Sequence, residues 1–353
     1  MLVRHERERR KVQISGKSSC MVALPKKWVK ELGLRQGSEV AITKLNASSL
    51  LINAQPDSLQ GGGREASFTV GAEDQPDAVF RKVVSLYVLG FSRIAMESSK
   101  GFLSTSRKTA LKDLIRRHLI GTEGVVESRD RMTVHVLLGY SELSVEAAVK
   151  KMLLIVDSLR RDVSQAFHGD SEGSTEATSE RQDEVGRFGL YVIRQLNLSL
   201  NQGVMQDLRL ENRDTLGYIQ ITRTLERVAY HAGTLARVLT MMERPPSKLS
   251  MGSLESMSES AFELVDQAML SLFKRDNEGA DKAVIACKAY VERAAQVIRA
   301  LDPTDSQAYY ALHSAMDSQR RMAEYAREIA EIVLDMTVER TLLEREPEAI
   351  ASY

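Results

Sequence analysis

The fold is decided by one stretch, Glu226-Arg227-Val228-Ala229-Tyr230-His231-Ala232-Gly233-Thr234-Leu235-Ala236, because a second stretch repeats its pattern. The second stretch is Arg320-Arg321-Met322-Ala323-Glu324-Tyr325-Ala326-Arg327-Glu328-Ile329-Ala330. Small or apolar residues coincide at the aligned positions 228/322, 229/323, 232/326, 235/329, 236/330 and 239/333, a spacing that lines one face of a helix. Small side chains on that face allow helices to approach closely. The repeat predicts two tandem three-helix bundles.

Helical periodicity continues on both sides of this repeat, from residue 142 to about residue 340. The predicted helices cover residues 144–167, 181–202, 214–242, 254–273, 277–301 and 305–340. A polar segment at 169–179 and the Pro pair in Arg244-Pro245-Pro246-Ser247 interrupt them. We therefore predict a first bundle over residues 141–243 and a second over residues 250–342.

The region before the helices, residues 65–140, has a mixed pattern. Strand patterns at 66–70 and 92–96 alternate with helical patterns at 77–89 and 105–118, and a hairpin follows around Arg129-Asp130. The order β-α-β-α-β-β predicts a small α/β layer. Arg116-Arg117-His118 fits the C-terminus of a helix there, because the negative end of the helix dipole favours basic side chains, and it is also a candidate contact for phosphate.

The first sixty residues form a separate, basic segment. Arg10-Lys11-Val12-Gln13-Ile14-Ser15-Gly16-Lys17 predicts a strand and a turn, and Leu24-Pro25-Lys26-Lys27-Trp28-Val29 predicts a short helix that ends at Gly33. Two further strands are predicted at 38–43 and 49–53, and Gly61-Gly62-Gly63 marks a domain boundary. So small a core favours pairing with a second copy.

Charge is unevenly distributed along the chain. The 353 residues carry no net charge, but residues 1–63 contain eleven Lys or Arg against five Asp or Glu, a balance of +6. A basic segment on a neutral body indicates an anionic partner such as double-stranded DNA. The residues that we predict to contact DNA phosphates are Arg9, Arg10, Lys11, Lys17, Lys26, Lys27 and Lys30.

Composition narrows the class of protein. Hydrophobic residues make up 43% and charged residues 27%, as in ordinary globular proteins. Cys20 and Cys287 offer no disulfide framework or zinc spacing, and the apolar runs are too short for a membrane span. We expect a cytoplasmic protein that does not insert into membranes. No phosphate-binding loop or catalytic triad is recognisable, so we do not expect an enzyme.

Residues 10–53 resemble the AbrB/SpoVT family of swapped-hairpin DNA-binding domains. The resemblance rests on Arg10-Lys11-Val12-Gln13, Gly16-Lys17, Val22-Ala23-Leu24-Pro25, Leu32-Gly33-Leu34 and Gly37-Ser38-Glu39-Val40, together with Trp28. It implies that two chains interleave their hairpins into one small barrel, so that each chain supplies half of it. It also implies that basic residues of the first strand, the turn and the short helix meet DNA.

The helical half resembles PhoU, a phosphate-uptake regulator built of two three-helix bundles. Gln182-Asp183-Glu184-Val185, Arg194-Gln195-Leu196 and the two repeat stretches carry this resemblance, and the combination with the head is similar to archaeal PhoU-type proteins. PhoU relatives bind metal clusters through acids in E-x-x-x-D spacing. Here Tyr230 follows Glu226 and Arg320 precedes Glu324, so the motif is degenerate. We expect no such cluster; the remaining candidate ligands are Asp183, Glu184, Glu226 and Glu324, whose alternative role is a solvated or partner-facing surface.

The fold class that we predict is multidomain and mainly α. An AbrB-like head (1–60) precedes the α/β layer (65–140) and the two PhoU-like bundles. The leading hypothesis is a dimeric, DNA-binding transcriptional regulator of phosphate uptake or phosphate homeostasis, whose bundles sense a ligand or a partner. The alternative is an adaptor that negatively regulates a phosphate transporter or signalling protein, with a head that serves only for dimerisation. A metal-dependent enzyme is the third and least favoured hypothesis.

Overall fold

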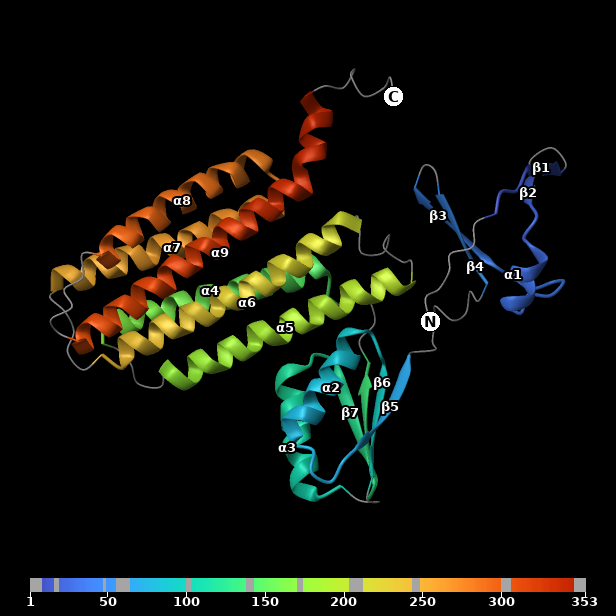
Figure 1. The fold of residues 1–353 in the computed structure, drawn as a ribbon, viewed down its shortest axis with the longest axis horizontal. Coiled ribbons are helices and arrows are strands. Elements are labelled where there is room, and N and C mark those ends of the chain that lie inside the picture. The colour runs from blue at the N-terminus through green and yellow to red at the C-terminus, as the bar shows by residue number, and fades with distance from the viewer. Residues whose placement is uncertain are drawn as a thin grey trace. The chain divides into compact units, whose positions relative to one another are not determined.

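The computed structural model describes ten stretches of the chain, residues 8–15, 19–46, 49–54, 64–99, 103–137, 143–169, 174–202, 212–242, 248–299 and 306–345. The chain divides into two compact units, Met1–Gly62 and Gly63–Tyr353 (Figure 1). The division falls at the glycines where the sequence predicts a boundary, although residues 61–63 themselves lie outside the described residues.

The first unit, which we call the head, contains two antiparallel hairpins and one short helix. Strand β1 (Val12–Ser15) pairs with β2 (Ser19–Val22), and β3 (Ala41–Asn46) pairs with β4 (Ser49–Asn53). Helix α1 (Lys26–Glu31) follows Pro25, and Gly33 ends it with a φ of +69°, which confirms the predicted stop. In the described residues the hairpins form two separate sheets rather than a closed barrel, so the shared barrel stays a prediction.

One predicted strand of the head is displaced along the chain. The sequence predicts a strand at 38–43, whereas β3 begins only at Ala41. The reason is a turn before it, in which the Ser38 amide donates to the Arg35 carbonyl at 3.0 Å and the Arg35 amide donates to Ser38 Oγ at 2.9 Å. Gly37 supports this turn with a φ of +84°.

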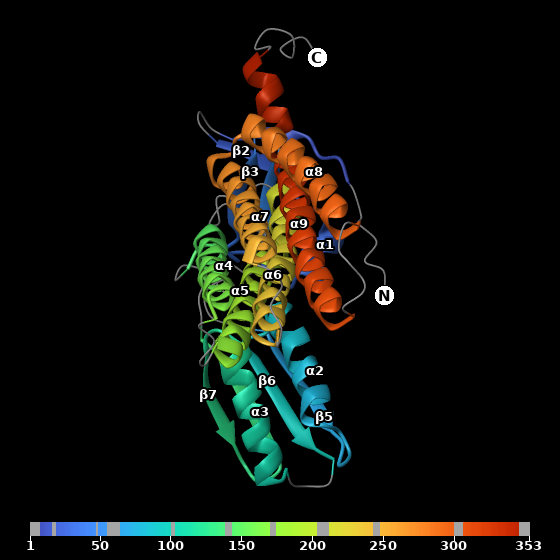
Figure 2. The same cartoon turned by 90° about the vertical axis from the view of Figure 1, so that its left-hand side faces the viewer.

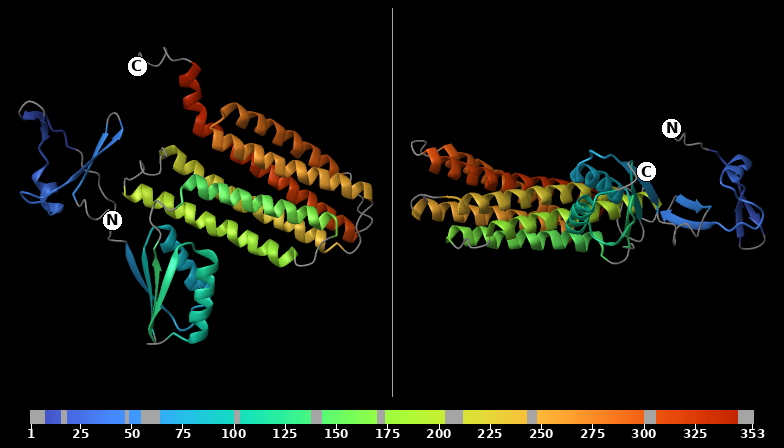
Figure 3. Two further views of the ribbon diagram at one scale, coloured as in Figure 1. Left: turned by 180° about the vertical axis from the view of Figure 1, so that it is seen from behind. Right: turned by 90° about the horizontal axis from the view of Figure 1, so that it is seen from below.

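The second unit begins with the α/β layer. Strands β5 (Glu65–Val70), β6 (Arg93–Ser98), β7 (Thr122–Glu127) and β8 (Arg131–Val136) form one sheet in the order β5-β6-β8-β7. Only the β5–β6 pair is parallel, because helix α2 (Pro76–Val88) crosses over between them. Helix α3 (Thr105–His118) and α2 lie on the same face of the sheet (Figures 1 and 3).

Successive side chains of a strand point to opposite faces of the sheet, and every second residue of β6 and β8 contributes to the core of this layer. Ile94 and Met96 of β6 and Met132 and Val134 of β8 point to the helix face and are fully buried. They pack against apolar residues of α2 and α3, among them Tyr87. The predicted β-α-β-α-β-β order is therefore present within residues 65–136.

In the described part of the chain, six long helices follow the α/β layer. They are α4 (Val145–Phe167), α5 (Ser174–Gln202), α6 (Asn212–Thr240), α7 (Lys248–Lys274), α8 (Asn277–Arg299) and α9 (Ser306–Arg345). Helices α4, α5 and α6 pack on one another, as do α7, α8 and α9 (Figure 2). Contacts of α6 with α9 and of α4 with α7 join the two groups, so that a single apolar core runs through all six helices.

Helix α5 begins earlier than the sequence predicts. Residues 169–179 have the composition of a polar loop, yet α5 already starts at Ser174. Thr178 explains this, since it is buried and its hydroxyl donates to Asp162 Oδ2 of α4 at 3.3 Å. Arg181 donates to the same oxygen at 2.7 Å. Polar packing rather than apolar spacing therefore orders the start of α5.

No helix in the described part of the chain is long and apolar enough to cross a membrane.

Candidate functional site

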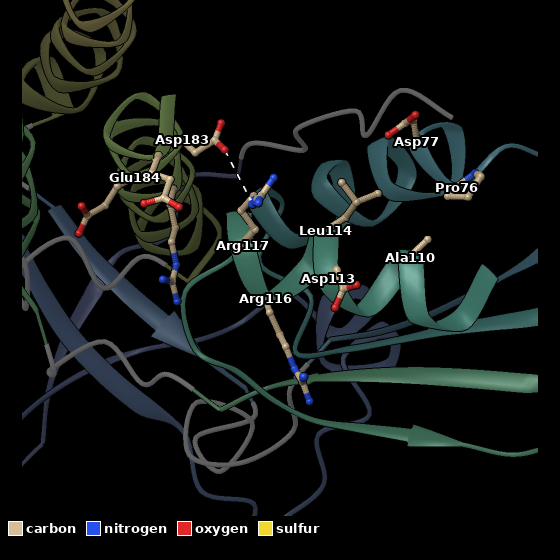
Figure 4. Close-up of a pocket in the computed structure, with 11 residues that line it drawn as sticks. Pro76, Asp77, Ala110, Asp113, Leu114, Arg116, Arg117, Asp183 and Glu184 are labelled. Atoms are coloured by element: carbon tan, nitrogen blue, oxygen red, sulfur yellow. Dashed lines mark ion pairs between the residues drawn. The ribbon is translucent and has the colours of Figure 1, made fainter. Parts of the chain in front are cut away.

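A groove of about 990 Å³ opens between the α/β layer and the first helical bundle. The start of α2 and α3 from Ala110 to Arg117 form one wall, and the first half of α5 forms the other (Figure 4). Its charged lining consists of Asp77, Asp113, Arg116 and Arg117 on one wall and Glu180, Asp183, Glu184 and Arg187 on the other. Grooves between packed layers are common places for ligands and partners to bind, which makes this one the candidate functional site.

Arg194 of α5, two turns beyond the groove residue Arg187, joins the α/β layer to the first bundle. This side chain is only 2% exposed, and its Nη1 donates to the carbonyl oxygens of Tyr87 at 2.5 Å and of Phe91 at 2.8 Å. Its guanidinium also lies over the Tyr87 ring, 4.9 Å from the centroid. Asn197 donates to the Val88 carbonyl at 2.8 Å. Since the last carbonyls of a helix lack partners within the helix, these two side chains cap α2 and join the two layers.

Close backbone packing at the same place depends on Gly90. This residue follows α2 with a φ of +90°, a conformation that glycine adopts without strain. A Cβ atom at this position would overlap with the Leu198 side chain of α5. The layer is therefore joined to the bundle through both hydrogen bonds and shape.

A weak ionic contact crosses between the two walls of the groove. Asp183 Oδ2 lies 3.9 Å from Arg117 Nε (Figure 4), and its Oδ1 lies 3.8 Å from His118 Nε2. Arg116 extends away from this pair. The three residues Arg116, Arg117 and His118 form the last turn of α3, as the sequence predicts. Both contacts are partly exposed; salt screens the Arg117 pair, and the His118 contact is ionic only while the imidazole is protonated. They therefore hold the walls together only weakly.

The structure disperses the four candidate metal ligands. Asp183 faces Arg117 and His118, whereas Glu184 is exposed on the groove wall. Glu226 of α6 accepts from Arg223 at 2.8 Å and lies against Gly189, about 9 Å along α5 from Asp183. Glu324 of α9 is paired with arginines of its own helix. Among the described residues no group of three or more His, Cys, Asp or Glu is placed to hold a metal ion.

Glu226 has a further electrostatic feature. Burial raises the pKa of its carboxyl group, while the neighbouring Arg223 lowers it. Its Oε1 atom is buried, and among the residues that the structure describes it has no hydrogen-bond partner. A carboxylate in this position is costly to ionise, and the donor set around it does not suit a divalent cation.

Polar side chains also meet where α6 of the first bundle packs on α9 of the second, a contact that we call the seam. The sequence does not predict that these side chains meet. Arg227 of α6 donates to Glu328 Oε1 of α9 at 2.9 Å and lies over the Tyr325 ring at 4.7 Å. His231 lies 5.8 Å from the Tyr325 ring, between centroids. Burial is the main cause that lowers the pKa of His231. These residues belong to the two repeat stretches, so the repeat brings its own copies into contact.

The basic residues of the head lie on its surface. Arg9, Arg10, Lys11, Lys26, Lys27 and Lys30 are exposed, and Lys17 lies outside the described residues. Arg10 is paired with Glu8, and Lys27 lies 4.0 Å from Glu31. The three lysines share the short helix α1, which has no buried residue. The head thus presents basic groups to solvent.

Each hairpin of the head also exposes an apolar face. Pairing of Val12 with Val22 and of Ile14 with Cys20 places these four side chains on one face of β1 and β2. Ile14 is 80% exposed, and the other three are exposed as well. Pairing of Ile42 with Ile52 repeats this on β3 and β4, and both residues are exposed. A single chain therefore leaves the apolar faces of both hairpins in contact with solvent.

Comparison with known proteins bears on the helical half, where α4, α5 and α6 form the first bundle. Residues 149–239 match the PhoU domain. The match begins within α4 and ends near the last residue of α6, so it covers the first of the two predicted bundles. The segment that matches the PhoU domain thus includes one wall of the groove and one side of the seam.

Among solved structures, the crystal structure of PhoU from Pseudomonas aeruginosa is similar to this chain. The similarity has a TM-score of 0.45 at 20% sequence identity, and it covers 55% of this chain and 96% of that chain. No curated protein matches the sequence.

The charged groove wall on α5 was only partly accessible to sequence reasoning. The sequence predicts Asp183 and Glu184 as candidate site residues, but it does not predict Glu180 or Arg187, which line the same wall. All four follow the helical spacing i, i+3, i+4 and i+7, which places them on one face. Which neighbour that face meets depends on the docking of α5 onto α3, and no local pattern reveals it.

Proposed function

We propose that the protein is a PhoU-type regulator of phosphate uptake or phosphate homeostasis whose head binds double-stranded DNA as a dimer. The PhoU domain at residues 149–239 is the observation that supports the regulatory part. In this proposal the protein catalyses no reaction and acts in the cytoplasm.

The exposed basic residues of the head support DNA binding. Lys26, Lys27 and Lys30 lie on one short helix in the described head, and each can neutralise a phosphate. Neutralised phosphates release counterions, so the affinity for DNA should fall steeply with salt. Contacts of this kind position a protein on a duplex without reading its sequence.

The exposed apolar faces of the two hairpins support dimerisation of the head. Burying exposed Val and Ile side chains against a second copy removes apolar surface from water, at about 25 cal/mol per Å². Two copies would also present two basic surfaces related by two-fold symmetry, as half-sites on DNA require.

DNA binding is tested with the full-length triple variant Lys26→Ala, Lys27→Ala, Lys30→Ala. We expect the slope of log affinity against log salt, measured by fluorescence anisotropy with duplex DNA, to decrease by about one for each lysine per chain. A matched control removes three exposed lysines from the helical unit, Lys151, Lys282 and Lys288, and should leave the slope unchanged.

The alternative function is an adaptor that docks on a phosphate transporter or a signalling protein. The apolar hairpin faces favour it equally, because they explain dimerisation without DNA. Wild-type protein that shows no retention of duplex DNA even at low salt would support the adaptor and refute the DNA-binding head.

A further inference from the structure

The equivalent turns of α6 and α9 carry the same ion pair with its charges exchanged. In α6, Arg223 Nη1 donates to Glu226 Oε2 at 2.8 Å. In α9, Arg320 Nη2 donates to Asp317 Oδ1 at 2.5 Å. The repeat aligns residue 223 with 317 and residue 226 with 320, so a carboxylate in one copy stands where an arginine stands in the other. Each copy compensates the charge within its own helix.

Arg320 binds a second carboxylate as well. Its Nη1 donates to Glu324 Oε1 at 2.5 Å, so the guanidinium lies between acids three residues before and four residues after it. Arg321 donates to the other oxygen of Glu324 at 3.3 Å. Hydrogen bonding to Asp317 is the main cause that raises the pKa of Arg320, and Glu324 adds to it. A guanidinium does not lose its proton in proteins, so this positive charge is permanent.

This arrangement does not fit a divalent metal ion. Hard cations bind through several carboxylate oxygens that are free to turn toward one centre. Here one oxygen of Asp317 and both oxygens of Glu324 accept hydrogen bonds from arginines, and Arg320 adds a positive charge between the two carboxylates. A dication placed at this turn would be repelled by the guanidinium and would find too few ligands.

We propose that Arg320 is a built-in cation that takes the place of the metal ion of PhoU relatives, so that the acidic turn of α9 is neutralised at any metal concentration. The side chain is 22% exposed and is held by two carboxylates of its own helix, which makes its position independent of a ligand. The second bundle then does not respond to the supply of divalent metal. This inference does not depend on whether the head binds DNA.

The test uses full-length protein freed of metal by chelation, with thermal unfolding followed by circular dichroism. Adding Mn²⁺ or Zn²⁺ should leave the wild-type midpoint unchanged, and elemental analysis should find no stoichiometric metal after purification. A site filled at a hundred times its dissociation constant would raise the midpoint by roughly 5 °C or more.

The decisive variant is Arg320→Glu, which places three acids on one face of α9. Its midpoint should fall by several degrees in chelator because of like-charge repulsion, and Mn²⁺ should restore it more than NaCl of equal ionic strength. Arg320→Gln should lose stability without any recovery by metal. Arg293→Glu, a charge reversal at an exposed position of α8, should change little and show no response to Mn²⁺.

Any of the following results would overturn the inference. One is a wild-type midpoint that rises with Mn²⁺ or Zn²⁺, or stoichiometric metal in the purified protein. Another is Arg320→Glu protein that is as stable as the wild type in chelator. The third is recovery of that variant by NaCl to the same extent as by Mn²⁺. If Arg320→Glu does not fold without metal, the wild type and Arg320→Gln still decide the question.

Discussion

Arg194→Ala is the substitution that should separate the α/β layer from the helical bundle. The change removes two charge-assisted hydrogen bonds, at 2.5 and 2.8 Å, from the carbonyls of Tyr87 and Phe91. Each such bond contributes about 1.5–3 kcal/mol. Removal also takes away the contact with the Tyr87 ring, but it relieves the cost of burying a guanidinium that is only 2% exposed.

The α/β layer should lose about 3 kcal/mol of the free energy with which it docks on the bundle. This is the lower part of the range for removing one partner of a buried charged contact. Because each 1.36 kcal/mol is a factor of ten, the layer should open roughly 150 times more often. Native-state hydrogen exchange, read by mass spectrometry, measures this opening directly. The amides of α2 and β6 should exchange faster by that factor, whereas those of α8 should not change.

The matched control is Arg187→Ala, on the same helix two turns earlier. Arg187 lines the groove but, in the part of the chain that the structure describes, makes no hydrogen bond through its buried Nε. Its loss should change exchange in α2 only slightly. Equal exchange in the Arg194→Ala and wild-type proteins, or an equal effect of Arg187→Ala, would refute the docking role of Arg194.

Two further predictions concern backbone packing and pH. Gly90→Ala should destabilise the protein by about 2–4 kcal/mol, because alanine is strained at a φ of +90° and its Cβ would overlap with Leu198. Gly186→Ala, in open space within α5, should instead stabilise by about 0.5–1 kcal/mol; urea unfolding compares the two, and equal effects would contradict the prediction. His231 has a pKa lowered from 6.5, mainly by burial, so the unfolded chain binds more protons below that pH and stability falls as the pH falls through it. His231→Gln should lose less stability between pH 7 and 5.5 than the wild type, while His313→Gln, at an exposed position, should behave as the wild type does in thermal unfolding.

Element types and order were predictable where local signals were strong. Helices α3 and α4 begin at Thr105 and Val145, against predicted starts at 105 and 144, and Ser104 and Ser144 cap them by accepting from the Arg107 and Ala147 amides. Gly33 ends α1 in the left-handed conformation that its position suggested. Such signals act within one or two turns, so a single sequence contains all that is needed to recognise them.

The groove and the seam between the bundles were not predictable, because they depend on contacts between distant residues. In the sequence, Arg194 is only part of the resemblance to PhoU. The residues next to it in the chain do not indicate that it caps a helix about 100 residues earlier. Thr178 belonged to a segment that read as a loop, and only its partner Asp162 on α4 turns that segment into helix. Tertiary partners decided these cases against local composition.

For the candidate metal ligands, the sequence shows which residues are present but not how their side chains are oriented. The sequence made clear that Tyr230 and Arg320 break the acidic spacing. It did not show that Arg320 would turn its guanidinium toward the acids on either side. That orientation is a matter of rotamers and hydrogen bonds, which spacing alone does not determine.

The uncovered apolar faces of the two hairpins have a consequence for how the protein is made. Val12, Ile14, Ile42 and Ile52 are synthesised well before the helices that follow, and within the described residues of the head they stay exposed. If two copies pair through these faces, as we propose, the nascent head exposes them until a second chain is present, so the time that they spend exposed depends on how densely ribosomes load one messenger. Neighbouring ribosomes on a shared transcript would bring the two halves together, and sparse translation would leave the early segment open to chaperones and proteases.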